Sequence, residues 1–120
     1  MIIGVGIDLL EIDRVKKLAE REAFLKKCYT DAERERFRAF PAALAGNFAV
    51  KEAVSKAFGT GFAGVAPAEI ECLRDTKGKP YVTLYGKAAE KAEELGVTAL
   101  HVSISDTDDL VTAIAVAEHS

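Results

Sequence analysis

The sequence has few of the residues that build metal or disulfide frameworks. It contains two cysteines, Cys28 and Cys72, in 120 residues, and neither belongs to a Cys-x-x-Cys pair or has a histidine beside it. This spacing does not favour a zinc site or a disulfide scaffold. We therefore interpret both cysteines as reduced thiols that pack in the interior.

The sequence also lacks a segment that could span or target a membrane. The apolar start, MIIGVGIDLLEIDR, is too short to cross a bilayer. It has neither the basic leader nor the small-residue cleavage site of a secretory signal. We therefore expect a cytoplasmic protein without a membrane partner.

An excess of positive charge is missing as well. The formal net charge is −3, which does not favour non-specific binding of nucleic acid. The charge is unevenly spread, because residues 11–40 hold nine Lys and Arg against seven Asp and Glu, whereas residues 41–120 hold seven against eleven. The N-terminal third is locally basic and is a candidate partner surface.

Apolar residues make up 49% of the chain, which suits one globular domain over residues 1–120. Residues 1–8 alternate in the manner of a strand, with Ile3, Val5 and Ile7 on one face. The opposite face is left bare by two glycines and ends in Asp8. We expect Asp8 to lie at the end of this strand.

The remaining pattern predicts helices and hairpins in sequence. Helices are expected over 11–27, 30–40, about 42–58 and 87–96, and strands over 70–74, 80–86, 99–105 and 110–118. Thr30 is a plausible N-cap with Glu33 three residues later. The third helix has a core stripe, formed by Val50, Ala53, Val54, Ala57 and Phe58. The order predicts an α+β fold whose mainly antiparallel sheet packs against helices.

The segment NFAVKEAVSKAFGTGF carries polar residues on the side opposite that stripe. Glu52 and Lys56 are four residues apart there, following Phe48. The simplest interpretation is an exposed ion pair worth about 0.3 to 0.5 kcal/mol. A second interpretation combines them with Asp8 and with the small residues of Gly59–Gly61, whose backbone N–H groups could approach an anion. Two carboxylates and a lysine are what a magnesium-assisted phosphoryl site needs, although the order differs from a Walker P-loop.

Three motifs together carry a resemblance to a known family. GVGIDLLEIDRV, NFAVKEAVSKAFGTG and HVSIS occur at a spacing that resembles the holo-acyl-carrier-protein synthases, over essentially the whole chain. The resemblance implies a transferase that moves 4′-phosphopantetheine from coenzyme A to a serine of an apo acyl carrier protein. It also implies Mg²⁺ dependence, release of adenosine 3′,5′-bisphosphate, and a trimer of small α+β units with sites between subunits.

The resemblance assigns roles to particular residues. It implies that Asp8 and Glu52 bind the metal and, with Lys56, are catalytic. Lys56 and the turn of Gly59, Thr60 and Gly61 would contact coenzyme A, as would His101 across a subunit boundary. His101 can equally be an ordinary polar residue of a hairpin strand, and we interpret Ser103 and Ser105 on the same face as structural.

A basic stripe on the first expected helix is the candidate docking surface. Arg14, Lys17 and Arg21 fall at i, i+3 and i+7, with Phe24 at the edge of the stripe. Such a stripe can be a simple solvated face. The resemblance implies docking of an acidic acyl carrier protein, because the matching helix of similar synthases has that role.

Two residues depart from the pattern of the family. Asn47 stands where many relatives have Arg, which removes a cation from around the coenzyme, and Asp106 stands where many have His, which changes the charge of a loop. The acceptor of the serine proton is either Glu52 or a magnesium-bound water that Asp8 or Glu52 orients. The alternatives to a transferase are a non-enzymatic ligand-binding α+β module and a magnesium-dependent phosphohydrolase.

Overall fold

The computed structural model describes all residues, 1–120. The α-helices are α1 (Ile12–Leu18), α2 (Glu22–Cys28), α3 (Asp31–Phe37), α4 (Pro41–Ala57) and α5 (Gly86–Leu95). The strands are β1 (Ile2–Glu11), β2 (Ile70–Arg74), β3 (Pro80–Leu84), β4 (Ala99–Asp106) and β5 (Leu110–Glu118). Two short 3-10 helices, η1 (Gly61–Ala63) and η2 (Pro67–Glu69), connect α4 to β2.

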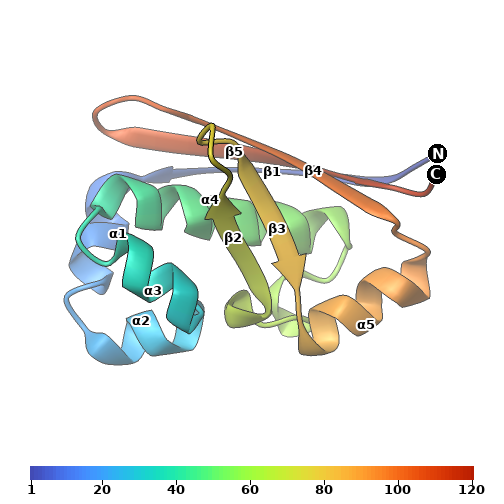
Figure 1. Ribbon diagram of the computed structural model, residues 1–120, viewed down its shortest axis with the longest axis horizontal. Coiled ribbons are helices and arrows are strands. Elements are labelled where there is room, and N and C mark those ends of the chain that lie inside the picture. The colour runs from blue at the N-terminus through green and yellow to red at the C-terminus, as the bar shows by residue number, and fades with distance from the viewer.

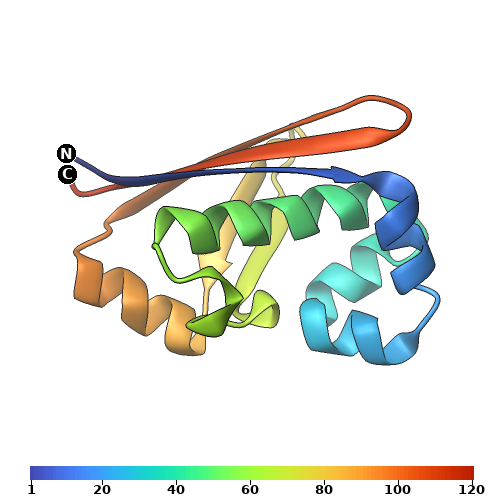
Figure 2. The same cartoon turned by 180° about the vertical axis from the view of Figure 1, so that it is seen from behind.

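The strands form two antiparallel sheets, one of three strands in the order β1-β5-β4 and one hairpin of β2 and β3. Helix α4 lies directly beneath the three-stranded sheet, and the hairpin crosses α4 on one side (Figures 1 and 2). The helices α1, α2 and α3 gather near one end of α4 and α5 lies near the other (Figure 1). The expected α+β fold with antiparallel strands is confirmed. None of the helices combines the length and the apolar character that a membrane crossing requires.

The glycine face of β1 is where the sheet meets α4. A Cβ added to Gly4 would lie 1.9 Å from the Ala57 carbonyl oxygen, and one added to Gly6 would lie 1.8 Å from the Ala53 carbonyl oxygen. Both distances are far below any real contact, so only glycine lets the strand backbone rest on the helix backbone. The face that the pattern leaves bare is therefore the buried face. The isoleucine and valine face points outward, with Val5 57% and Ile7 62% exposed.

Strand β1 is longer than expected, and the prediction that it ends at Asp8 was wrong. The strand continues to Glu11 because β5 supplies partners beyond residue 8, with Asp8 opposite Ala113 and Glu11 opposite Leu110. The Thr112 hydroxyl also donates a hydrogen bond of 2.8 Å to the Asp8 carbonyl oxygen. Asp8 is thus held inside a strand, on the side that faces α4.

The prediction of one helix over residues 11–27 was also wrong, since α1 ends at Leu18 and α2 starts at Glu22. At about 100° per residue, Leu25 on a straight helix would point roughly 220° away from Ile12. The break allows Ile12 on α1 and Leu25 on α2 both to be buried in the core. Packing of two apolar faces therefore overrides helix continuity.

The other expected elements are confirmed within three residues at each end, the largest difference being α3, which ends at Phe37 where residue 40 was expected. Thr30 caps α3 in a capping box with Glu33. Helix α4 runs from Pro41 to Ala57, and its predicted stripe is buried in the core. Helix α5 ends at Leu95 and is capped by Gly96, which adopts a left-handed φ of 79°.

A buried polar network that the sequence did not reveal fixes α4 against its neighbours. The Lys51 ammonium donates to Glu33 Oε1 at 2.7 Å and to the Pro67 carbonyl oxygen at 3.0 Å, and Asn47 Nδ2 donates to Glu33 Oε2 at 3.0 Å. All three polar side chains of this network are fully buried. Burial lowers the pKa of Lys51, and the Glu33 charge opposes that shift. Asn47 is therefore an internal link between α4 and α3 in this chain.

The strand-to-helix contact generates a stability prediction. Gly6→Ala should lower the free energy of unfolding by about 2 kcal/mol or more, because its Cβ meets helix backbone that cannot yield easily. Gly46→Ala is the matched control, since its Cβ would lie an ordinary 3.4 Å from Ile104. It should change stability by less than about 1 kcal/mol. Urea unfolding of both variants checks this, and equal stabilities would contradict the close packing of β1 on α4.

Candidate functional site

Three charged side chains meet where the glycine face of β1 crosses the open side of α4. Most of α4 is buried, and Phe48, Glu52 and Lys56 form its partly exposed side. Asp8 follows Gly6 on the same face of β1 and so points toward that side. The Lys56 ammonium donates to Asp8 Oδ1 at 3.0 Å and to the Ile7 carbonyl oxygen at 3.0 Å. The carboxylate partner of Lys56 is Asp8, so the interpretation of Glu52 and Lys56 as a simple surface pair was wrong.

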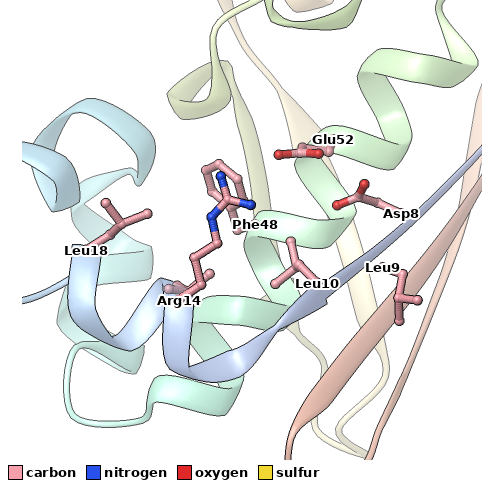
Figure 3. A pocket seen from close by; sticks show the side chains of 8 residues that line it. Asp8, Leu9, Leu10, Arg14, Leu18, Phe48 and Glu52 are labelled. Carbon is pink, nitrogen blue, oxygen red and sulfur yellow. The ribbon is translucent and has the colours of Figure 1, made fainter.

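Asp8 and Glu52 form a pair of neighbouring carboxyl groups (Figure 3). Asp8 Oδ2 is buried and has no hydrogen-bond partner. Burial first, and then the neighbouring Asp8, raise the pKa of Glu52 to about 7, while Lys56 and Arg14 act in the opposite direction. The site therefore concentrates negative charge that a proton or a cation can relieve.

The donor set fits a small hard cation. Two carboxylates meet here, and one of them has an unpartnered buried oxygen. The structure contains no group of three or more acidic, histidine or cysteine side chains arranged to hold a metal ion. Mg²⁺ commonly takes one or two carboxylates and completes its octahedron with water and substrate phosphate oxygens. A cation here would leave several coordination positions for such oxygens.

A cavity of about 260 Å³ opens beside the carboxylates (Figure 3). One end is acidic, and the rest is mostly apolar with one guanidinium. The lining residues are Asp8, Leu9, Leu10, Arg14, Val15, Leu18, Phe48 and Glu52. The cavity thus joins β1, α1 and α4. It suits a ligand that presents charge at one end and apolar groups at the other.

The glycine turn follows directly after the lysine. Gly59 and Gly61 have positive φ values of 76° and 57°, which favour glycine. Thr60 N–H donates to the Ser55 carbonyl oxygen at 3.1 Å, and the Thr60 hydroxyl donates to the Gly61 carbonyl oxygen at 2.8 Å. No atom lies within 4 Å of a Cβ built on either glycine, so the turn is open to a ligand.

His101 does not join the carboxylates within one chain. It lies on β4 opposite Val116 of β5. The buried residues of β5 lie on the other face of the sheet. Its side chain is 61% exposed, and its Nε2 lies 2.9 Å from Glu118 Oε1. Ser103 is exposed on the same strand. The structure therefore leaves His101 on a face away from Asp8.

The predicted basic stripe is not one continuous helical row. Arg14 and Lys17 are exposed on α1, whereas Arg21 is the residue before α2. Phe24 on α2 packs against Phe48, with ring centroids 5.9 Å apart. Arg14 belongs to the cavity as well as to the surface, a role that residue spacing alone did not indicate.

Two comparisons with known proteins each match nearly the whole chain. The model of the 4′-phosphopantetheinyl transferase superfamily matches residues 4–115. A holo-[acyl-carrier-protein] synthase from Lachnoclostridium phytofermentans is 52% identical over 118 residues, which cover 98% of this chain and 97% of that protein.

Solved structures show the same fold. The crystal structure of a holo-ACP synthase from Plasmodium yoelii has a TM-score of 0.88 and 35% identity, covering 100% of this chain and 97% of that one. A holo-(acyl-carrier-protein) synthase from Bacillus anthracis in complex with CoA (3′,5′-ADP) has a TM-score of 0.84 and 32% identity, covering 100% of this chain and 99% of that one.

The carboxylate pair predicts an unusual titration in the metal-free protein. Glu52 should titrate near pH 7, and Asp8→Asn should lower that pKa by removing a neighbouring charge. Because the folded pKa lies above the ordinary 4.5, this group lowers the free energy of unfolding as the pH rises from about 4.5 through 7. Carboxyl ¹³C NMR checks the titration, with Glu52→Gln to assign the signal. A midpoint near 4.5 would contradict the coupled pair.

Proposed function

The chain belongs to the 4′-phosphopantetheinyl transferase superfamily and within it to the holo-[acyl-carrier-protein] synthases, and we propose that it transfers 4′-phosphopantetheine from coenzyme A to a serine of apo acyl carrier protein. Adenosine 3′,5′-bisphosphate is the released product. The observation that carries the proposal is the group formed by Asp8, Glu52 and Lys56 beside the open glycine turn. The Bacillus anthracis relative in complex with CoA supports coenzyme A as the substrate.

Asp8 and Glu52 are the residues that would hold Mg²⁺. The bound ion would supply positive charge for the pyrophosphate oxygens as the phosphate bond breaks. Lys56 would bind a phosphate group, since its side chain is 51% exposed and its ammonium is already in the site. The backbone N–H groups of the Gly59–Gly61 turn would approach other phosphate oxygens.

The reaction requires in-line attack and the removal of one proton. The carrier serine oxygen attacks the phosphorus joined to pantetheine, forming a new P–O bond while the bond to the nucleotide phosphate breaks. Lys56 stabilises the charge that grows on the oxygens, and the cavity holds the reactants in line. Glu52 is placed to accept the serine proton, directly or through one water molecule.

We further propose that the protein is a homotrimer. Large apolar side chains are exposed on the outer face of β1 and β5, namely Val5, Ile7, Leu9, Leu110 and Ile114. A continuous exposed apolar face of this kind is typical of a subunit interface. His101 lies on the same sheet and would reach the coenzyme at a neighbouring subunit's site.

The carrier would dock on the basic residues of the N-terminal third. Arg14, Lys17 and Arg21 are exposed, and acyl carrier proteins are acidic. Arg14 lines the cavity that contains Glu52, so docking there would bring a carrier serine toward the carboxylates. The cytoplasm is the proposed compartment.

The activity is tested by incubating the protein with coenzyme A, Mg²⁺ and apo acyl carrier protein and weighing the carrier by mass spectrometry. We expect the mass gain of one phosphopantetheine group. Asp8→Asn and Glu52→Gln should each reduce the rate about 10²-fold or more, because each removes a group that organises charge in the transition state.

The other outcomes identify the alternatives. Hydrolysis of coenzyme A without modification of the carrier would indicate a phosphohydrolase, and binding without turnover would indicate a binding module. Near-normal transfer by either variant, folded and at saturating Mg²⁺, would contradict the role given to the carboxylates.

The docking proposal predicts a selective kinetic change. Arg14→Glu with Arg21→Glu should raise the KM for the carrier and weaken its salt dependence, while the KM for coenzyme A changes little. Lys87→Glu with Lys91→Glu is the matched control, since both lysines belong to α5. Helices α5 and α1 lie near opposite ends of α4 (Figure 1). A wild-type carrier KM in the first variant would place docking elsewhere.

The trimer is tested by sedimentation equilibrium. The wild-type chain should sediment as three copies of 12.9 kDa. Ile7→Glu should dissociate it, because a charge would be placed in the apolar face, and should lower transfer if neighbouring subunits share sites. A fully active monomer, wild-type or variant, would reject both the trimer and the shared site.

A further inference from the structure

Lys56 already fills part of the site where the carboxylates would bind a cation. Its ammonium bonds to Asp8 Oδ1 and to the Ile7 carbonyl oxygen, both at 3.0 Å. The Asp8 side chain is only 10% exposed, so solvent competes weakly at that end of the pair. The ammonium is therefore hydrogen-bonded to one of the two carboxylate oxygens of Asp8.

The remaining oxygen of Asp8 is the one without a partner. Asp8 Oδ2 is buried beside Glu52 and accepts no hydrogen bond. A divalent cation that binds this oxygen would lie close to the Lys56 ammonium through their common carboxylate. Two positive charges at that separation repel each other. Lys56 therefore opposes binding of a cation as long as it stays on Asp8.

The geometry also allows Lys56 to leave. Its side chain is 51% exposed and projects from the open side of α4, three residues before the glycine turn begins. If Lys56 moved away, it would lose two hydrogen-bond acceptors, the Asp8 carboxylate and the Ile7 carbonyl oxygen of β1. The bound cation would then neutralise the Asp8 carboxylate. A phosphate placed against the turn would offer the ammonium a new anionic partner within its reach.

We propose that the Lys56 ammonium is an internal stand-in for the metal ion, which holds the site closed to a cation alone and moves to a phosphate when coenzyme A arrives. Metal and coenzyme then bind with positive coupling, part of which runs through this one side chain. The proposal rests on the proposed function, because it takes the phosphate-bearing ligand to be coenzyme A. Coupling of this kind must be reciprocal, so metal also strengthens coenzyme binding.

Removal of the Lys56 charge should have opposite effects on metal binding in the absence and in the presence of coenzyme A. Removing the ammonium with Lys56→Met should strengthen binding of metal alone, since a competing positive charge is lost. The same change should weaken binding of metal in the presence of coenzyme A, since the phosphate loses its cation. A residue that only contacts phosphate would produce the second effect without the first.

The experiment measures binding of Mn²⁺ by EPR, which counts the free ion, with and without saturating coenzyme A. For Lys56→Met we expect affinity for Mn²⁺ alone to rise roughly fivefold or more, and the coupling factor to fall by a similar amount. Lys56→Arg keeps the cation and should retain most of the coupling. Lys91→Met removes one lysine charge on α5 and should leave both affinities at their wild-type values.

Each outcome bears on the proposal. Unchanged or weaker binding of Mn²⁺ alone in a folded Lys56→Met variant would overturn it, even if carrier modification is normal in the wild-type protein. An equal rise in the Lys91→Met control would also overturn it, because net charge would then explain the effect. If the wild-type protein binds neither Mn²⁺ nor coenzyme A and does not modify the carrier, the proposed function itself fails.

Discussion

The close contact between the backbone of β1 and the backbone of α4 is the constraint on which the site depends. Gly4 and Gly6 permit this contact because any Cβ would overlap the Ala57 or Ala53 carbonyl. Asp8 is the next residue on the same face. The contact therefore delivers its carboxylate to the one side of α4 that stays partly open, where Glu52 and Lys56 lie. The same face of β1 therefore packs on α4 and supplies a carboxylate to the site.

The approach of Asp8 to Glu52 is electrostatically unfavourable. Two carboxyl groups approach each other in a partly buried place, which raises the pKa of Glu52 to about 7. Lys56 offsets the charge on one oxygen of Asp8, and the other oxygen has no partner. Perturbed carboxyl groups of this kind are common at functional sites. The buried Lys51 and Glu33 pair, by contrast, is satisfied within the fold and holds α4 in place.

Local patterns in the sequence predicted most of the elements and marked the two carboxylates as candidates. Alternation identified β1, the apolar stripe identified α4, and the spacing of Glu52 and Lys56 marked the open side of that helix. Properties that depend on packing at a distance were not accessible. The break between α1 and α2 arises because Ile12 and Leu25 must both be buried, and the chain there contains no glycine or proline to mark it. The burial of Lys51 has no local signal in the sequence because its partners, Glu33 and the Pro67 carbonyl, come from other elements.

We propose that Asp8 and Glu52, brought together by the glycine contact, hold one divalent cation. The most direct test is a crystal grown with Mn²⁺ and coenzyme A, with the metal located by its anomalous scattering. We expect one peak within about 2.0 to 2.2 Å of an oxygen from each carboxylate, with phosphate or water oxygens at the other positions and Lys56 turned away from Asp8. A metal bound elsewhere, or coenzyme A bound with no metal between these two carboxylates, would contradict it.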